Sequence, residues 1–226
     1  MKNIKYIFSV AALFAVAVVN AQTFNWDDFK KEQKNIVNIN VSSDYALTYG
    51  IGYNYQLTSK LPIVLNAEYS FPSGSTITDD FKAKIGGHID WFQTGNFHFV
   101  SKIQGVFRRY ENDYARLLNF GADLSGIVGY YESNWFVAGE IGFDKAIVTH
   151  FRHSDLYKSN FPGIKDGWYE PATGGNFYYG IQAGYSRKKF DIYMKAGKLT
   201  EQDFKTAPLL PFYGQLGVNI KFQIIS

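Results

Sequence analysis

Apolar and polar residues alternate along most of this chain. Between residues 45 and 57 the odd positions are large and apolar, such as Tyr49 and Ile51, whereas the even positions are small or polar, such as Gly50 and Asn54. The same alternation recurs over residues 63–71, 81–91, 118–130, 135–147, 177–185, 190–196 and 212–224. A period of two residues is typical of β-strands with one apolar face. The charged residues share a face with the glycines, which favours a barrel with lipid outside and a polar interior.

Short and long connections alternate between these segments. Short ones lie near residues 58–60, 94–96, 133–134 and 187–188, and longer ones near 72–79, 110–114, 150–175 and 200–211. Outer-membrane barrels have short periplasmic turns and longer external loops. The strand at 45–57 must therefore run toward the periplasm. Residues 36–41 can form the preceding strand, which runs from the periplasm to the outside, if Ser42–Asp44 forms a tight external turn. This predicts an all-β, closed antiparallel transmembrane β-barrel of about ten strands, with eight as the alternative.

One uninterrupted strand is the competing interpretation of the first hairpin. The odd-position phase continues unbroken from Val37 to Leu57, and a single strand there leaves nine, an odd number that is rare in bacterial barrels. Around Thr94, Gly95 and Asn96 the inward positions are even-numbered on both sides. That parity predicts a three-residue turn with Asn96 in the left-handed conformation.

The N-terminus carries the features of an export signal. Lys2 and Lys5 precede an apolar stretch at residues 7–19, and Ala21 ends a small-residue cleavage site. The stretch is shorter than the roughly 20 residues of a membrane-spanning helix. We expect a cleaved signal peptide at 1–21, a periplasmic N-terminal segment at 22–35 and the barrel at 36–226. Residues 24–35 form either a short helix capped by Asn25 or a disordered leader.

Composition narrows the function. The chain has no cysteine, which excludes thiolate catalysis and thiolate metal sites. Its net charge of +3 is dispersed, with no basic stripe of the kind that binds nucleic acid. Aromatic residues make up 18%, as expected of a barrel with aromatic girdles at both membrane interfaces.

Charged residues of both signs are predicted to meet inside the barrel. His88 should lie opposite Lys102, with Asp90 diagonal to His98. These side chains form either a polar pathway for a small solute or a salt-bridge network that fills the lumen. The predicted lumen charge network consists of His88, Asp90, Lys102, Arg108, Glu140 and Asp144. Asp123 is predicted to face Asp144, a pairing that would need a cation or a shared proton.

The long external loop, 150–175, is too aromatic for a floppy connection and is predicted to be ordered and functional. Its partner- or ligand-binding candidates are His150, His153, Asp155, Trp168 and Tyr169. The histidines and the acid suggest a general base or metal ligands, but their spacing matches no zinc signature. Tryptophan and tyrosine commonly anchor protein interfaces, which favours a docking surface.

The leader, the alternating strands and the rhythm of short and long connections together resemble the small outer-membrane β-barrel superfamily of Gram-negative bacteria, from residue 36 onward. The resemblance implies an integral outer-membrane protein. Our main hypothesis is a non-enzymatic structural or accessory subunit, whose loop docks a larger outer-membrane protein assembly or outer-membrane lipid. The alternatives are a surface enzyme acting on lipid or peptide through the His150–Asp155 region, and a narrow solute channel. We assign no catalytic residue, metal or cofactor, and expect no nucleic-acid partner.

Overall fold

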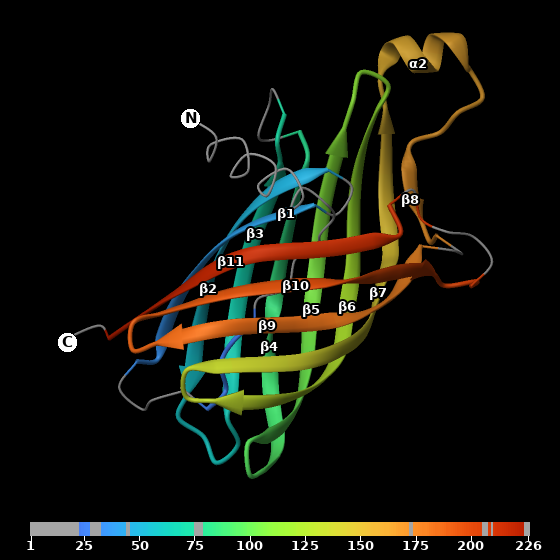
Figure 1. The fold of residues 1–226 in the computed structure, drawn as a ribbon. Helices are drawn as coiled ribbons and strands as arrows, with labels where there is room; N and C mark the ends of the chain where they lie inside the picture. Colours follow the sequence, from blue (N-terminus) through green and yellow to red (C-terminus); the bar gives the residue numbers. More distant parts are fainter. Residues whose placement is uncertain are drawn as a thin grey trace, which may run out of the picture.

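A closed β-barrel forms the body of the molecule (Figure 1). The computed structural model describes residues 23–27, 33–43, 46–74, 79–171, 174–204, 208 and 210–223, so the predicted signal peptide lies outside the described part. Within that part, one antiparallel sheet holds eleven strands, and the β1–β11 pairing of the first and last strands closes the ring. The strands are β1 (Asn35–Ser43), β2 (Leu47–Leu57), β3 (Ile63–Pro72), β4 (Phe81–Thr94), β5 (Phe97–Glu111), β6 (Ala115–Glu132), β7 (Trp135–His153), β8 (Gly167–Tyr169), β9 (Gly175–Arg187), β10 (Phe190–Glu201) and β11 (Phe212–Phe222).

The wall of the barrel has ten strands, because β8 pairs only with the outer part of β7. The first hairpin is confirmed: β1 and β2 are separate strands, with Ser42 opposite Thr48 and Ser43 opposite Leu47. The hydroxyl groups of Ser42 and Thr48 hydrogen-bond across the hairpin. The prediction of ten strands is therefore confirmed, and the nine- and eight-strand alternatives are wrong.

The two faces of the wall differ in polarity. Ile85, Ile141 and Ile181 are 65–70% exposed on the outside. Lys102 and Asp123, by contrast, are each 1% exposed inside. A large apolar exterior is stable only against lipid. The barrel is accordingly an integral membrane structure of the outer-membrane type. Among the described residues, no helix is long and apolar enough to cross a membrane.

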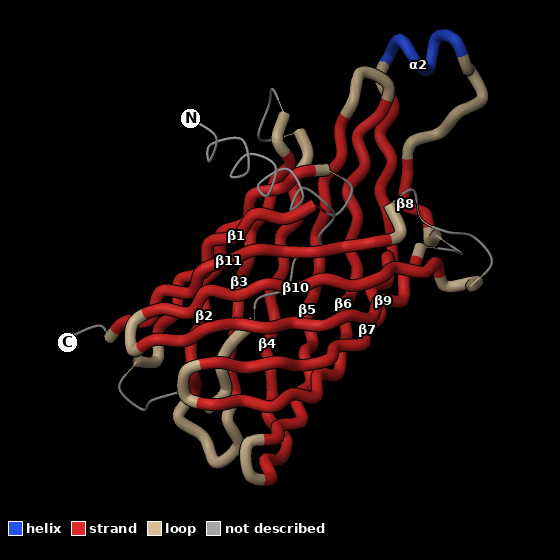
Figure 2. Tube along the Cα trace, viewed as in Figure 1, coloured by secondary structure: helices blue, strands red, loops and turns tan. Residues whose placement is uncertain are grey.

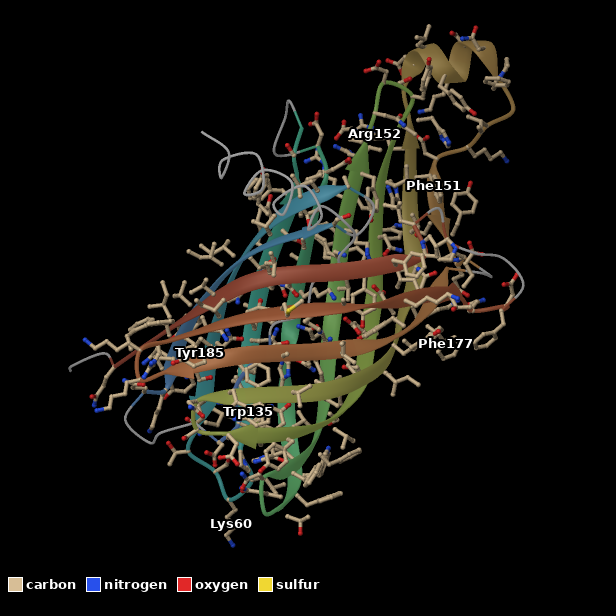
Figure 3. All side chains as sticks on the ribbon, viewed as in Figure 1. Lys60, Trp135, Phe151, Arg152, Phe177 and Tyr185 are labelled. Atoms are coloured by element: carbon tan, nitrogen blue, oxygen red, sulfur yellow. The ribbon has the colours of Figure 1, made fainter. Side chains whose placement is uncertain are left out.

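Aromatic side chains mark the two edges of the lipid-facing band. Toward the short turns, Trp135 lies opposite Tyr185 and its ring is 5.5 Å from that of Tyr130 (Figure 3). Toward the long loops, the rings of Phe107 and Phe120 are 4.9 Å apart. Phe120 and Tyr130 are ten positions apart along β6, close to the roughly 9–11 residues that a tilted strand needs to cross a bilayer.

A β-bulge corrects the predicted turn between β4 and β5. The turn contains Gly95 and Asn96 alone, and Gly95, not Asn96, has a positive φ of 57°. The register shifts between Asp90 and Phe92, so that Trp91 and Phe92 are both exposed on the outside. The extra residue of a bulge exchanges the inward and outward positions along the rest of the strand. This exchange explains why the inward positions before the bulge and after the two-residue turn are both even-numbered.

Inside the barrel, aromatic rings lie on glycines of neighbouring strands. A Cβ atom built on Gly142 would lie 2.3 Å from the ring of Tyr178, and one built on Gly217 would lie 2.4 Å from that of Tyr193. Glycine has no side chain to pack and allows this close approach. The half of the lumen formed by β6, β7, β9, β10 and β11 is therefore closely packed.

Candidate functional site

An ion-pair network occupies the middle of the lumen. Lys102 Nζ lies 3.1 Å from Glu140 Oε1 and 3.7 Å from Asp123 Oδ2. Lys84 Nζ lies 2.7 Å from Asp123 Oδ2, and Lys195 forms an ion pair with the other oxygen of Glu140. These five side chains come from β4, β5, β6, β7 and β10 and are each at most 2% exposed. Buried charges are tolerated when they are paired in this way.

Further ion pairs lie nearer the two ends. His98 Nδ1 lies 2.6 Å from Asp90 Oδ2, and at the loop end Arg108 binds Asp144. The predicted pairing of Asp123 with Asp144 across β6 and β7 is confirmed. The charge compensation expected for this pair comes from cationic side chains rather than from a shared proton, because Lys84 binds Asp123 and Arg108 binds Asp144.

His88 is the one predicted network residue without an ion pair in the described part of the chain. Its position opposite Lys102 is confirmed. Its ring, however, contacts the N-terminal segment: the centroids of Phe24 and Trp26 lie 5.1 and 6.5 Å away.

The N-terminal segment, residues 23–27, lies inside the barrel. Thr23, Phe24, Asn25 and Trp26 are each at most 6% exposed. Asn25 Nδ2 donates to Glu132 O (2.7 Å) and to Ser186 Oγ (2.9 Å). A disordered leader does not describe these residues. The Asn25 side chain accepts a hydrogen bond from the Asp27 amide, as the cap of the predicted helix would, but residues 23–27 themselves form a turn. Residues 28–32 lie outside the described part.

Phe24 and Trp26 complete an apolar core in the lumen, on the side of the short turns. That core also contains Ile36, Val64, Val100, Ile127, Tyr131, Phe136, Ala138 and Tyr193. Asn219 Nδ2 donates to Thr23 O (2.7 Å), so the segment is bound by opposite parts of the wall, from β4 to β11. No pattern in the sequence predicted this arrangement.

The lumen face of β2, β3 and β5 is different in character. We call the set Asn54, Asn66, Glu68 and Gln104 the amide-rich wall. All four side chains are at most 5% exposed. Both polar atoms of Asn66, both of Gln104 and both carboxylate oxygens of Glu68 have no hydrogen-bond partner in the described structure. Buried polar groups are normally satisfied by protein or ordered water, so this wall faces a part of the lumen suited to water or a polar solute.

The external hairpin rises above the barrel, where β6 and β7 continue past the membrane band and carry β8 and the helix α2 (Asp155–Asn160) (Figures 1 and 2). The strand β7 runs to His153, further than predicted. His150 lies on β7 opposite Trp168 of β8, with ring centroids 4.9 Å apart, and Tyr169 lies opposite Thr149. Figure 3 shows Phe151 and Arg152 on the same extension.

The structure does not bring His150 and Asp155 together. Asp155 is in the first turn of α2, whereas His153 Nδ1 lies 3.0 Å from Asp166 Oδ1. An acid–base pair of His150 with Asp155 is absent from the described residues, which also contain no cluster of three or more His, Asp or Glu side chains suited to a metal ion.

Asp166, which was not among the residues predicted from the sequence, organises this loop. It accepts hydrogen bonds from the His153 amide (2.9 Å) and from Lys158 Nζ (2.6 Å). These two donors, the amide first, hold the pKa of the Asp166 carboxyl well below its usual range. The loop contacts therefore persist at pH values where an ordinary aspartate is already protonated, and they are lost only as the pH falls through the depressed pKa.

No protein-family profile and no curated protein matches the chain. Among solved structures, a KdgM porin is similar with a TM-score of 0.44 and 8% identity, over 83% of this chain and 99% of that one. A KdgM porin in complex with disordered oligogalacturonate gives 0.43 and 8% over the same shares.

The membrane assignment rests on the barrel itself. Continuous antiparallel ladders leave no free edge in the ring, which is required of a sheet in lipid because unpaired backbone groups are costly there. With its apolar exterior, aromatic edges and polar lumen, the chain is an integral outer-membrane protein of the small β-barrel class.

Proposed function

We propose that this protein is a narrow channel for small polar solutes, whose own N-terminal segment closes the lumen in the observed state. The observation that carries the proposal is the amide-rich wall. Each buried polar group without a partner costs about 1–3 kcal/mol, so a purely structural lumen would have filled this wall with apolar or paired side chains. Water or solute at the wall removes that cost.

The N-terminal segment supplies the closure. Phe24 and Trp26 fill the apolar end of the lumen, and Asn25 and the Thr23 carbonyl bind its wall through hydrogen bonds. The attachment is non-covalent, so release of this short segment would empty the part of the lumen that Phe24 and Trp26 fill.

The test is conductance in planar bilayers, using the chain from residue 22 onward. Burial of one phenylalanine contributes about 1.5–3 kcal/mol, so the double variant Phe24→Ala/Trp26→Ala should shift the closed-to-open ratio by more than about a hundredfold. We expect rare openings in the unmodified barrel and frequent ones in the double variant. The matched control is Asp27→Asn, at an exposed side chain of the same segment, which should behave like the unmodified barrel. Silence of correctly folded barrels of both kinds would rule out the channel.

Partner docking by the external hairpin is a second candidate function. Trp168, Leu156 and Phe161 are 55–60% exposed above the membrane band, where exposed aromatic residues commonly anchor protein partners. If the hairpin docks a partner, a protein that co-purifies in mild detergent should be lost from the Trp168→Ala/Tyr169→Ala variant and kept by Asp155→Asn. Equal recovery with both variants would contradict docking through these aromatic residues.

A further inference from the structure

The residues of the amide-rich wall lie close together on the inner surface of the barrel. Asn54 of β2 lies directly opposite Asn66 of β3, and Asn66 lies opposite Gly86 of β4. Gly86 in turn lies opposite Gln104 of β5. A Cβ atom on Gly86 would lie 2.0 Å from the Ile103 carbonyl oxygen, so no side chain stands between Asn66 and Gln104. The two primary amides therefore lie on either side of a position that carries no side chain, where the backbones of β4 and β5 approach closely.

Glu68 extends this region toward the loop end. It lies two residues beyond Asn66 on the same face of β3, opposite Gly52 on one side and Lys84 on the other. Lys84 Nζ binds Asp123 at 2.7 Å. Together Glu68, Lys84 and Asp123 bring charges of both signs, so the region offers no excess of positive charge to an anion.

The unsatisfied atoms include both donors and acceptors. The donors are Asn66 Nδ2 and Gln104 Nε2, and the acceptors are the side-chain oxygens of Asn54, Asn66, Glu68 and Gln104. A metal cation satisfies acceptors only, and an anion satisfies donors only while meeting the Glu68 carboxylate. A hydroxyl group donates and accepts at one atom, so several adjacent hydroxyl groups match the mixed set.

We infer that the amide-rich wall is a binding site for neutral polyhydroxylated solutes, such as sugars or sugar alcohols. This inference rests on the proposed channel and names the class of solute that the channel takes. Asn66 and Gln104 bind the solute through both amide atoms, and Glu68 accepts from its hydroxyl groups and disfavours anionic analogues.

Three probes with closely related six-carbon polyol skeletons test the inference: sorbitol is neutral, gluconate is anionic and N-methylglucamine is cationic. Binding is measured by saturation-transfer NMR on the chain from residue 22 onward in detergent micelles, which does not require conductance. We expect saturable transfer to sorbitol, and affinity for gluconate at least tenfold weaker. The variant Glu68→Gln should keep sorbitol binding and reduce the difference in affinity between sorbitol and gluconate.

The decisive variant is Asn66→Ala/Gln104→Ala, which should weaken sorbitol binding at least tenfold. Gln93→Ala, at an exposed amide of β4, is the control and should leave binding unchanged. Folding of each variant is checked by heat-dependent gel migration; if the double variant does not fold, Gln104→Ala alone replaces it. Absence of saturable sorbitol binding, equal binding of gluconate, or unchanged binding in the variant would overturn the inference. Conductance reports separately on the channel, so the two failures are distinguishable.

Discussion

Replacement of Glu140 by glutamine is expected to lower the free energy of unfolding of the barrel by about 3–5 kcal/mol, the usual cost of breaking a buried ion pair. Glu140 is the carboxylate that binds Lys195, and it also lies 3.1 Å from Lys102. Without it Lys195 stays buried with no opposite charge in contact, whereas Lys102 keeps Asp123 at 3.7 Å. Urea unfolding in lipid vesicles, followed by tryptophan fluorescence, measures the change.

Two variants make this result specific. Glu170→Gln removes an exposed carboxylate and should leave the stability within about 0.5 kcal/mol, as is usual for surface substitutions. Adding Lys195→Met to Glu140→Gln removes the stranded cation, so the double variant should be more stable than Glu140→Gln alone. If Glu140→Gln proves as stable as Glu170→Gln, the network does not stabilise the lumen.

Gly197→Val is expected to prevent correct folding of the barrel or to destabilise it by about 3 kcal/mol or more, at or beyond the upper end of overpacking costs. A Cβ atom there would lie 2.3 Å from the Tyr179 carbonyl oxygen and 2.5 Å from the ring of Tyr213. The carbonyl belongs to the wall and cannot move without breaking its ladder. The yield of folded protein in vesicles, judged by heat-dependent gel migration, measures the effect.

Gly126→Val is the matched control, because a Cβ atom at Gly126 meets nothing within 4 Å. Gly126 lies between Leu124 and Val128 on the outward face of β6, and valine is a residue type that is favoured in strands. This variant should fold as well as the unmodified chain. Equal folding yields for the two valine variants would mean that the close approach at Gly197 has no energetic importance.

The strand content and much of the register could be predicted from the sequence. Alternation is strong because one face meets lipid and the other a polar lumen, and a shift by one residue would exchange the two. The opposition of His88 to Lys102 follows from this parity. The turn after β4 could not be predicted, because a β-bulge in the strand and an extra residue in the turn have the same effect on which positions face inward. Only the backbone structure distinguishes the observed bulge at Asp90/Phe92 from the predicted three-residue turn.

The contents of the lumen were less accessible to sequence analysis. Phe24 and Trp26 lie outside any alternating segment, and their contact with His88 depends on closure of the whole ring. The amide-rich wall shows no local signal either, since asparagine and glutamine occupy inward positions that any polar residue fits. His150 was assigned to a loop because the wall segment of β7 was expected to end near residue 147, whereas pairing with β6 and β8 extends the strand.

The N-terminal segment also implies an order of assembly. Its hydrogen bonds reach partners 107, 161 and 196 residues further along the chain, at Glu132, Ser186 and Asn219. Contacts of such long sequence separation are slow to form, and the last of these partners lies on β11, which closes the ring against β1. The segment has no complete binding site before that closure. The segment can therefore complete its contacts only when the wall of the barrel is finished.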